Sequence, residues 1–213
     1  MLIKIQTFLK KDVNILWVGG SSLFLFVIIG LLVTLFPNNP IDLFVQYIAQ
    51  TYTPIDVKGF FFAITNSYKN VALYLILVVV LIMIRKLDVI AGFFIASAAT
   101  SYLTDATKQF FGRWRPDEQA TLYDMRSFPS GHTSGAFIIM FLVIWGVYHT
   151  TKSKLIRGAT VISCATYAIL IGLSRIVMNV HWLTDVLGGI LLAFAVWCFT
   201  VYLVRRQKMG SGE

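Results

Sequence analysis

The chain has 213 residues, of which 57% are hydrophobic and 13% are charged, and its mean hydropathy is +0.76. Because soluble proteins carry about 25% charged residues, this composition excludes a disordered chain, a disulfide-stapled secreted domain and an ordinary water-soluble enzyme. A polytopic membrane protein remains, and its net charge of +8 indicates cationic cytoplasmic loops first and phosphate binding second.

Six apolar segments follow one another along the chain. The first, 16–36, suffices to cross about 30 Å of hydrocarbon at about 1.5 Å per residue, whereas the second, 71–84, is short unless it extends back through 66–70. The first is too long for the apolar region of a signal peptide, and no small-residue cleavage site follows it. We therefore predict an all-α fold, an integral membrane bundle of six transmembrane helices forming a single domain, residues 1–213. The spans are predicted at about 16–36, 67–85, 88–107, 132–149, 156–173 and 184–204.

The loop after the first span contains two further helical segments. Asn39 can cap a helix that begins at Pro40, in which Ile41, Phe44 and Ile48 share one face. A second segment, 55–65, carries three consecutive phenylalanines. We predict two short amphipathic helices in this first outer loop, lying at the membrane interface. They either cover the bundle or guide lipid toward a site.

Charge asymmetry orients the spans. With the N-terminus inside, 11 of the 18 Lys and Arg residues fall in cytoplasmic segments. Both termini are therefore expected in the cytoplasm of a multi-pass cell-membrane protein. Most of the exceptions lie after the third span or at the end of the fifth, which indicates a functional site at the outer (extracellular or periplasmic) face.

Three polar stretches lie at that outer face. They are Lys108 to Pro116, Pro129 to His132, and Ser174 to Asp185. Because the topology places all three at one membrane surface, they can converge on a single site.

The basic residues of these stretches are suited to bind phosphate. Lys108, Arg115 and Arg175 bring three positive charges to the edge of the hydrocarbon, and guanidinium groups match phosphate oxygens. Ser130 and Gly131 precede a predicted helix, whose first backbone N–H groups favour an anion. We predict that these five residues form a phosphate-binding cradle.

Two of the three histidines lie in the same stretches. His181 and Asp185 are spaced to share one helical face, and the carboxylate can orient the ring so that Nε2 is free as a nucleophile. His132 can protonate a leaving oxygen. Together with the cradle, these residues predict phosphoryl transfer through a phosphohistidine, and no metal-ligand cluster accompanies them.

Other polar residues have simpler interpretations. Arg113 and Arg126 are interpreted as interfacial anchors, and His149 as an interface residue at the cytoplasmic end. Cys164 and Cys198 are interpreted as small buried hydrophobic residues within apolar segments.

The three stretches together resemble the signature of the type 2 phosphatidic acid phosphatase and vanadium haloperoxidase superfamily. That signature is Lys, six residues, then Arg-Pro; Pro-Ser-Gly-His; and Ser-Arg, five residues, His, three residues, Asp, and this sequence fills every position. The positions are Lys108, Arg115, Pro116, Pro129, Ser130, Gly131, His132, Ser174, Arg175, His181 and Asp185. The resemblance covers about residues 60–205, and the apolar spans favour the membrane branch.

The resemblance implies a role for each of these residues. His181 is the nucleophile, Asp185 orients it, and His132 is the general acid. The five cradle residues hold the phosphate, and Pro116, Pro129 and Ser174 support the site. The implied activity is metal-independent hydrolysis of a phosphoric monoester or pyrophosphate on a lipid, and no cofactor is expected.

The substrate stays open between several lipids. The moderate size and the cationic, polytopic character favour undecaprenyl pyrophosphate, and phosphatidylglycerophosphate or phosphatidic acid is the alternative. A phosphotransferase would share the first half of the mechanism. A non-catalytic lipid-phosphate carrier is a hypothesis of another class, which His181 and Asp185 disfavour because binding alone needs no nucleophile. The expected partners are the lipid substrate and the bilayer, not nucleic acid.

Overall fold

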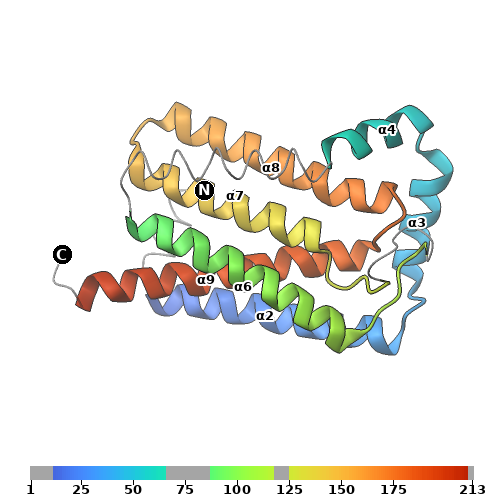
Figure 1. Ribbon diagram of the computed structural model, residues 1–213, viewed down its shortest axis with the longest axis horizontal. Coiled ribbons are helices and arrows are strands. Elements are labelled where there is room, and N and C mark those ends of the chain that lie inside the picture. The colour runs from blue at the N-terminus through green and yellow to red at the C-terminus, as the bar shows by residue number, and fades with distance from the viewer. Residues whose placement is uncertain (1–11, 66–86, 118–124, 211–213) are drawn as a thin grey trace.

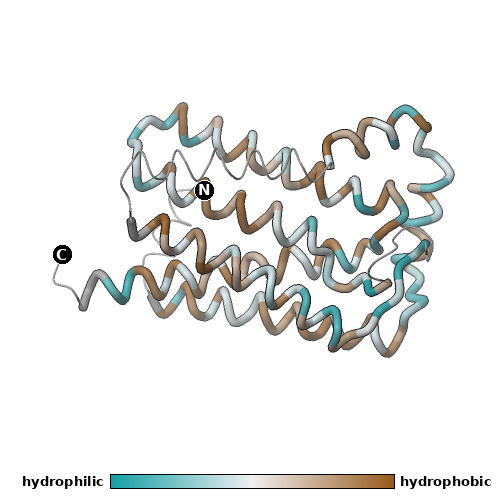
Figure 2. Tube along the Cα trace, in the orientation of Figure 1, coloured by the Kyte–Doolittle hydropathy of each residue, from teal (hydrophilic) through white to brown (hydrophobic). Residues whose placement is uncertain are grey.

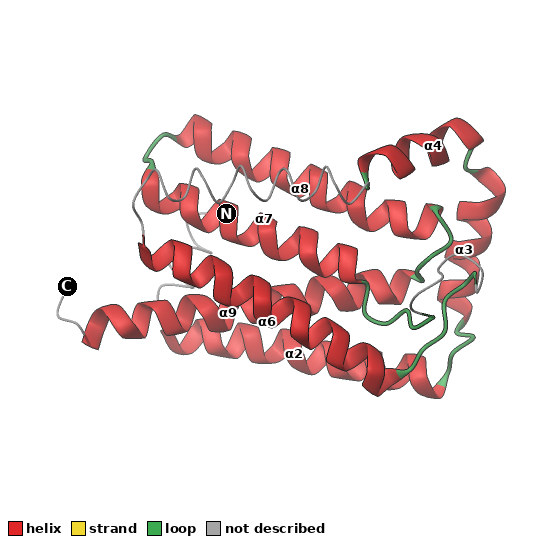
Figure 3. Ribbon diagram, viewed as in Figure 1, coloured by secondary structure: helices red, strands yellow, loops and turns green. Residues whose placement is uncertain are grey.

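A computed structural model describes residues 12–65, 87–117 and 125–210. The fold is all-α within these ranges, where the only extended pairing is an isolated bridge between Trp114 and Arg126 (Figure 3). The helices, labelled as in Figure 1, are α2 (Asp12–Leu35), α3 (Pro40–Tyr52), α4 (Ile55–Ile64), α6 (Leu87–Phe111), α7 (Gly131–Thr150), α8 (Lys154–Val177) and α9 (Leu183–Gly210).

Five of these helices are long and apolar enough to cross a membrane: α2, α6, α7, α8 and α9. They lie lengthwise in one bundle, with apolar residues along the middle of each helix and polar residues toward the ends (Figure 2). Five of the predicted spans are thus found as helices, whereas the predicted span 67–85 lies outside the described residues. Helix α6 runs to Phe111, past its predicted end at 107, and Lys108 in its last turn is buried.

The outer surface of the bundle is apolar, as a lipid solvent requires. On α2, Trp17 and Phe24 are 73% and 65% exposed, and α8 likewise exposes Ile162. Soluble monomers rarely expose apolar surface on this scale, whereas hydrocarbon solvates it at no cost. Polar residues instead lie inside, where Ser22 donates to the Leu191 carbonyl oxygen across the α2–α9 contact at 2.8 Å. The protein is therefore a multi-pass membrane protein.

Helices α3 and α4 cover one end of the bundle (Figure 1). The loop contains two helices, and the predicted cap is present, since the Asn39 side chain accepts from the Asp42 amide. Helix α3 turns Asp42 and Gln46 inward and exposes Ile41 to 65%. That the two helices are amphipathic and lie at a membrane interface stays a prediction.

Helix α3 also completes the C-terminal end of α8. Gln46 and Gln50 each donate to the Ile176 carbonyl oxygen at 3.2 Å, and Gln50 also reaches the Val177 oxygen. The last carbonyl groups of a helix have no partner within it. The Ile176 oxygen also accepts the Asn179 amide at 3.0 Å, so the glutamine side chains add donors to it, and Gln50 supplies one to Val177. The first outer loop therefore stabilises the chain segment that leads out of α8.

The start of α7 lies against α9 at very short range. A Cβ atom added at Gly189 would lie 2.8 Å from the Ser130 carbonyl oxygen and 3.1 Å from the Ser134 nitrogen. Only glycine permits this approach of two backbones. The approach lets the Ser130 amide donate to the Asp185 carbonyl oxygen at 3.0 Å. The second and third polar stretches of the sequence are joined in this way.

Gly189→Ala is expected to lower thermal stability, because the added carbon must displace backbone rather than a side chain. Overpacking of this kind costs about 1–3 kcal/mol. The matched control is Gly20→Ala on α2, where an added Cβ meets nothing within 4 Å. Thermal unfolding of both variants in detergent measures the difference, and equal melting temperatures would contradict the close packing.

Candidate active site

The three polar stretches meet at the end of the bundle that α3 covers (Figure 3). Lys108 lies in the last turn of α6 and Arg175 in the last turn of α8, whereas Asp185 lies in the first turn of α9. The connecting segments place Arg115 3.2 Å from His181, although 66 positions separate them in the chain. The convergence expected from the topology is present in the structure.

His181 and Asp185 form a buried pair. Nδ1 of His181 lies 3.3 Å from Oδ2 of Asp185, and the two side chains are 2% and 0% exposed. The same oxygen accepts the Trp182 amide at 2.9 Å. The turn that presents the ring follows Asn179, whose φ of 60° is left-handed, and the His181 amide donates back to the Arg175 carbonyl oxygen.

The other ring nitrogen of His181 faces the cationic side of the site. Nε2 lies 3.2 Å from Nη1 of Arg115, which also donates to the Val180 carbonyl oxygen at 2.8 Å. Burial lowers the pKa of His181 to about 4, although Asp185 opposes the shift. The imidazole is therefore neutral near pH 7 and keeps a lone pair on Nε2.

Two more cations are buried beside this ring. Lys108 and Arg175 are each only 7% exposed, and Lys108 donates to the Arg126 carbonyl oxygen at 2.7 Å. Nε of Arg175 is buried and has no hydrogen-bond partner. A buried unpaired guanidinium N–H is unfavourable, and a bound phosphate oxygen would relieve it.

The N-terminus of α7 supplies backbone donors, but the Ser130 amide is not one of them, contrary to the sequence-based prediction. The Ser130 amide donates to Asp185, and Ser130 Oγ accepts from Thr133, so the Ser130 amide does not face a ligand. The amides of Gly131 and His132 open the helix and have no acceptor within it. His132 follows Gly131 in the first turn of α7 and is exposed, so it lies at the same end of the bundle as the cations.

The interpretation of Arg113 as an interfacial anchor is wrong. Its guanidinium is buried, and Nη1 donates to Oδ1 of Asp185 at 2.9 Å and to Oγ1 of Thr184 at 2.6 Å. Nη2 donates to Oδ2 of Asp42 at 2.6 Å. The sequence did contain a signal for this role. In an extended segment alternate side chains lie on the same side, so Arg113 lies on the same side as Arg115 of the signature. Trp114, between them, is 62% exposed.

Asp42 was missed altogether. It lies on α3, far from the signature in sequence, and accepts from Arg113, from Asn39 and from both the amide and the hydroxyl of Thr184. Burial raises the pKa of Asp42, but the hydrogen bonds from Thr184, Arg113 and Asn39 outweigh this and hold it below the ordinary 3.8. Asp42 and Arg113 thus connect the first outer loop to the carboxylate behind His181.

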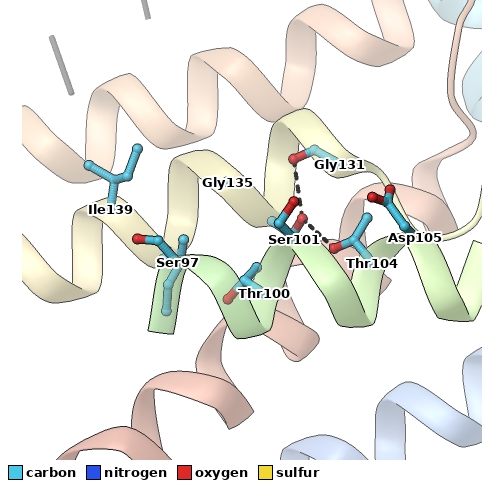
Figure 4. Close-up of a pocket in the computed structure, with 10 residues that line it drawn as sticks. Ser97, Thr100, Ser101, Thr104, Asp105, Gly131, Gly135 and Ile139 are labelled. Atoms are coloured by element: carbon cyan, nitrogen blue, oxygen red, sulfur yellow. Dashed lines mark hydrogen bonds between the residues drawn. The ribbon is translucent and has the colours of Figure 1, made fainter. Parts of the chain in front are cut away.

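A pocket of about 220 Å³ adjoins this site between α6 and α7 (Figure 4). It begins at Gly131 and is lined on the α6 side by hydroxyl-bearing residues and Asp105. For a metal ion, by contrast, no group of three His, Cys, Asp or Glu side chains is found in the part of the chain that the structure describes.

Comparison with known proteins identifies the family. A family model described as the PAP2 superfamily matches residues 86–209, more than half of the chain. The chain belongs to the PAP2 superfamily. All three polar stretches lie inside the matched region, whereas Asp42 and the rest of α3 lie outside it.

Two curated relatives share part of this PAP2 chain. It is 35% identical over 113 residues to phosphatidylglycerophosphatase B of Bacillus subtilis (strain 168), covering 50% of this chain and 56% of that protein. It is 39% identical over 87 residues to the lipid A 1-phosphatase of Porphyromonas gingivalis, covering 41% of this chain and 17% of that protein. The chain thus matches little more than half the length of the first relative and much less of the second.

Two solved structures share the fold. The crystal structure of the first transmembrane PAP2 type phosphatidylglycerolphosphate phosphatase from Bacillus subtilis superposes with a TM-score of 0.74 at 22% identity, over 90% of this chain and 96% of that one. Aquifex aeolicus LpxE gives a TM-score of 0.62 at 24% identity, over 77% and 96% of the two chains. At these identities the likeness establishes the PAP2 membrane fold.

Asp42→Asn is expected to destabilise this PAP2 chain near neutral pH, because breaking a buried ion pair costs about 3–5 kcal/mol. The folded-state pKa of Asp42 lies below its ordinary value, so its stabilisation is complete above about pH 4 and is lost as the pH falls through the folded-state pKa. The difference in melting temperature between wild type and variant should therefore narrow below pH 4.

The matched control is Asp56→Asn, which removes an exposed carboxylate from the first turn of α4. It should leave the melting temperature nearly unchanged. The melting temperatures of the wild type and of Asp42→Asn are compared from pH 7 to pH 3. A small difference, or one that does not change with pH, would show that the Asp42–Arg113 pair does not stabilise the folded chain.

Proposed function

We propose that this protein is an integral membrane lipid phosphatase that hydrolyses a phosphate from a lipid phosphate or pyrophosphate through a phosphohistidine. The observation that carries the proposal is the buried His181 ring, which binds Asp185 through Nδ1 and presents Nε2 beside Arg115. A carrier would need the cations but not a neutral, carboxylate-oriented imidazole among them. The names of the relatives support the same class of activity.

In the first step, Nε2 of His181 attacks phosphorus, and the bond from phosphorus to the leaving oxygen breaks. Arg115 pairs with a phosphate oxygen on binding, which releases the Nε2 lone pair that it contacts in the unliganded site. His132 gives a proton to the leaving oxygen, and Asp185 stabilises the positive charge that develops on the His181 ring.

In the second step, a water molecule attacks the phosphohistidine, and the nitrogen–phosphorus bond breaks. His132, now deprotonated, accepts the proton of that water, so that the site returns to its starting state with inorganic phosphate bound. Arg175, Lys108 and the amides that open α7 stabilise the phosphate charge in both steps. These donors are held by the protein before substrate binds, so little reorganisation is needed.

Two substrate classes fit this mechanism. The relatives are named for phosphatidylglycerophosphate and lipid A, which supports glycerophospholipid and saccharolipid phosphates. Undecaprenyl pyrophosphate, favoured on size and charge, stays a prediction. Phosphate release from a panel containing phosphatidylglycerophosphate, phosphatidic acid and undecaprenyl pyrophosphate measures the preference directly.

His181→Gln is expected to reduce phosphate release by several orders of magnitude, because it removes the nucleophile while it keeps a polar side chain. The matched control is His149→Gln, which changes a histidine at the other end of α7 that contacts the Trp145 carbonyl oxygen. Acid-labile labelling of the protein from ³²P-lipid should be lost in the first variant and kept in the second. Near-normal turnover by His181→Gln would rule out the phosphohistidine.

We also propose that the site faces away from the cytoplasm. The end of the bundle opposite α3 carries five cations: Lys152 between α7 and α8, Lys154 and Arg157 in the first turn of α8, and Arg205 and Arg206 near the end of α9 (Figure 1). Cationic loops favour the cytoplasmic side of a membrane. Most of the cations at the other end belong to the candidate site. Phosphate binding therefore explains why they lie there, against the charge rule.

A cysteine at Ile55 is expected to react with a membrane-impermeant maleimide in intact cells, whereas a cysteine at Leu155 should react only after the membrane is opened. These residues lie at opposite ends of the bundle and are 80% and 82% exposed, which makes them a matched pair. Cys164 and Cys198 are replaced by Ala beforehand. The reverse labelling pattern would place the site in the cytoplasm.

A further inference from the structure

Helix α3 turns a polar side toward the bundle, where it crosses the ends of α8 and α9 (Figure 1). The structure describes the whole of α3, and its only buried residues are Asp42 and Gln46, one helical turn apart. Phe44 and Tyr47, by contrast, are each 62% exposed. A helix that only covered the bundle would gain nothing from this arrangement, because packed apolar residues are often as stabilising as a buried ion pair, or more so.

Asp42 reaches Asp185 by two routes. Its carboxylate accepts from the Thr184 amide at 3.0 Å, and this amide is one of the first in α9, which have no acceptor within the helix. Because the side chain of Trp182, just before α9, has no acceptor, α3 supplies a cap that the α9 sequence lacks. The second route is Arg113, which lies 2.6 Å from Asp42 and 2.9 Å from Oδ1 of Asp185.

Gln46 reaches the turn that presents His181. Its Nε2 donates to Oδ1 of Asn179 and to the Ile176 carbonyl oxygen, the latter at 3.2 Å. Asn179 has a φ of 60°, a left-handed conformation that is uncommon for residues other than glycine. The hydrogen bond from α3 therefore restrains this turn two residues before the ring.

We infer that Asp42 and Gln46 are positioning residues for phosphoryl transfer. Asp42 holds the carboxylate that orients the His181 ring, and Gln46 holds the turn that carries this ring. Because α3 lies outside the region that matches the PAP2 family, neither residue is a position of the family signature. The inference rests on the proposed function, in which Nε2 of His181 attacks phosphorus.

This role predicts a greater effect on the chemical step than on binding. Attack requires Nε2 to point at phosphorus within a narrow range of angles, so a small rotation of the ring slows the reaction. Lys108 and Arg175 lie on α6 and α8, so phosphate binding should depend less on α3 than the attack does.

The test measures formation of the phosphohistidine in a single turnover, with the ³²P-labelled lipid that the wild type hydrolyses fastest among the three of the panel. Asp42→Asn is expected to lower the rate constant of labelling about 10- to 100-fold, comparable to the loss when the partner that orients a metal ligand is removed. Gln46→Met, which leaves no buried charge unpaired, should lower it about 2- to 10-fold, the effect of one hydrogen bond. KM should change less than the rate constant in both variants.

The amplitude of labelling counts folded sites, whereas the rate constant reports their chemistry. Reduced amplitude at an unchanged rate constant in both variants would show that α3 only supports the fold, and would overturn the inference. The matched control, Asp56→Asn, makes the same change at an exposed carboxylate of α4 and should keep both values.

His181→Gln tests the proposed function separately. If this variant still hydrolyses lipid at a near-normal rate, the phosphohistidine is wrong and the positioning role falls with it. If it is inactive while Asp42→Asn and Gln46→Met label at the wild-type rate, only the positioning role is wrong.

Nuclear magnetic resonance examines the ring without turnover. With ¹⁵N-labelled histidine, the ring signals come from the three histidines of the chain, and His132→Gln and His149→Gln assign those of His181. In the wild type near pH 7, Nδ1 should carry the proton and Nε2 should be free. Asp42→Asn is expected to shift both signals toward a mixture of the two tautomers, and Asp56→Asn to leave them in place. Unchanged His181 signals in Asp42→Asn would overturn the inference.

Discussion

The carboxylate of Asp185 is the constraint on which the site depends. It has no exposure to solvent, and both of its oxygens are engaged. Oδ2 accepts from His181 and from the Trp182 amide, and Oδ1 accepts from Arg113. These bonds fix the carboxylate in rotation as well as in position, so the imidazole ring is held in one orientation. The backbone of the same residue binds the Ser130 amide and thereby aligns the start of α7 with it.

The first outer loop does more than cover the end of the bundle, because its side chains hold parts of the site in place. Asp42 holds the second nitrogen of Arg113, and Gln46 and Gln50 bond the last carbonyls of α8, from which the His181 turn departs. A displacement of α3 would therefore disturb both Arg113 and the end of α8, and through them Asp185 and His181. The alternative role of this loop, guidance of lipid toward the site, stays a prediction.

The sequence predicts those parts of the structure that obey simple rules. Apolar length predicts five of the described helices, and Asn39-Pro40 predicts the start of α3. Short-range spacing predicts the His181–Asp185 contact because residues one helical turn apart must be neighbours. Common location at one membrane surface predicts that the three stretches meet. No local rule connects Asp42 to Arg113, which are 71 positions apart, because that contact depends on how α3 packs against the bundle.

The charge balance of the buried groups explains why Arg113 is needed at all. Asp42 and Asp185 are the only buried carboxylates among the described residues, and Arg113 binds both. Among the described residues of the site, Lys108, Arg113, Arg115 and Arg175 carry four positive charges and the buried carboxylates of Asp42 and Asp185 carry two negative charges, so two positive charges are in excess. A phosphate dianion is the ligand that balances this excess in a site of low dielectric constant.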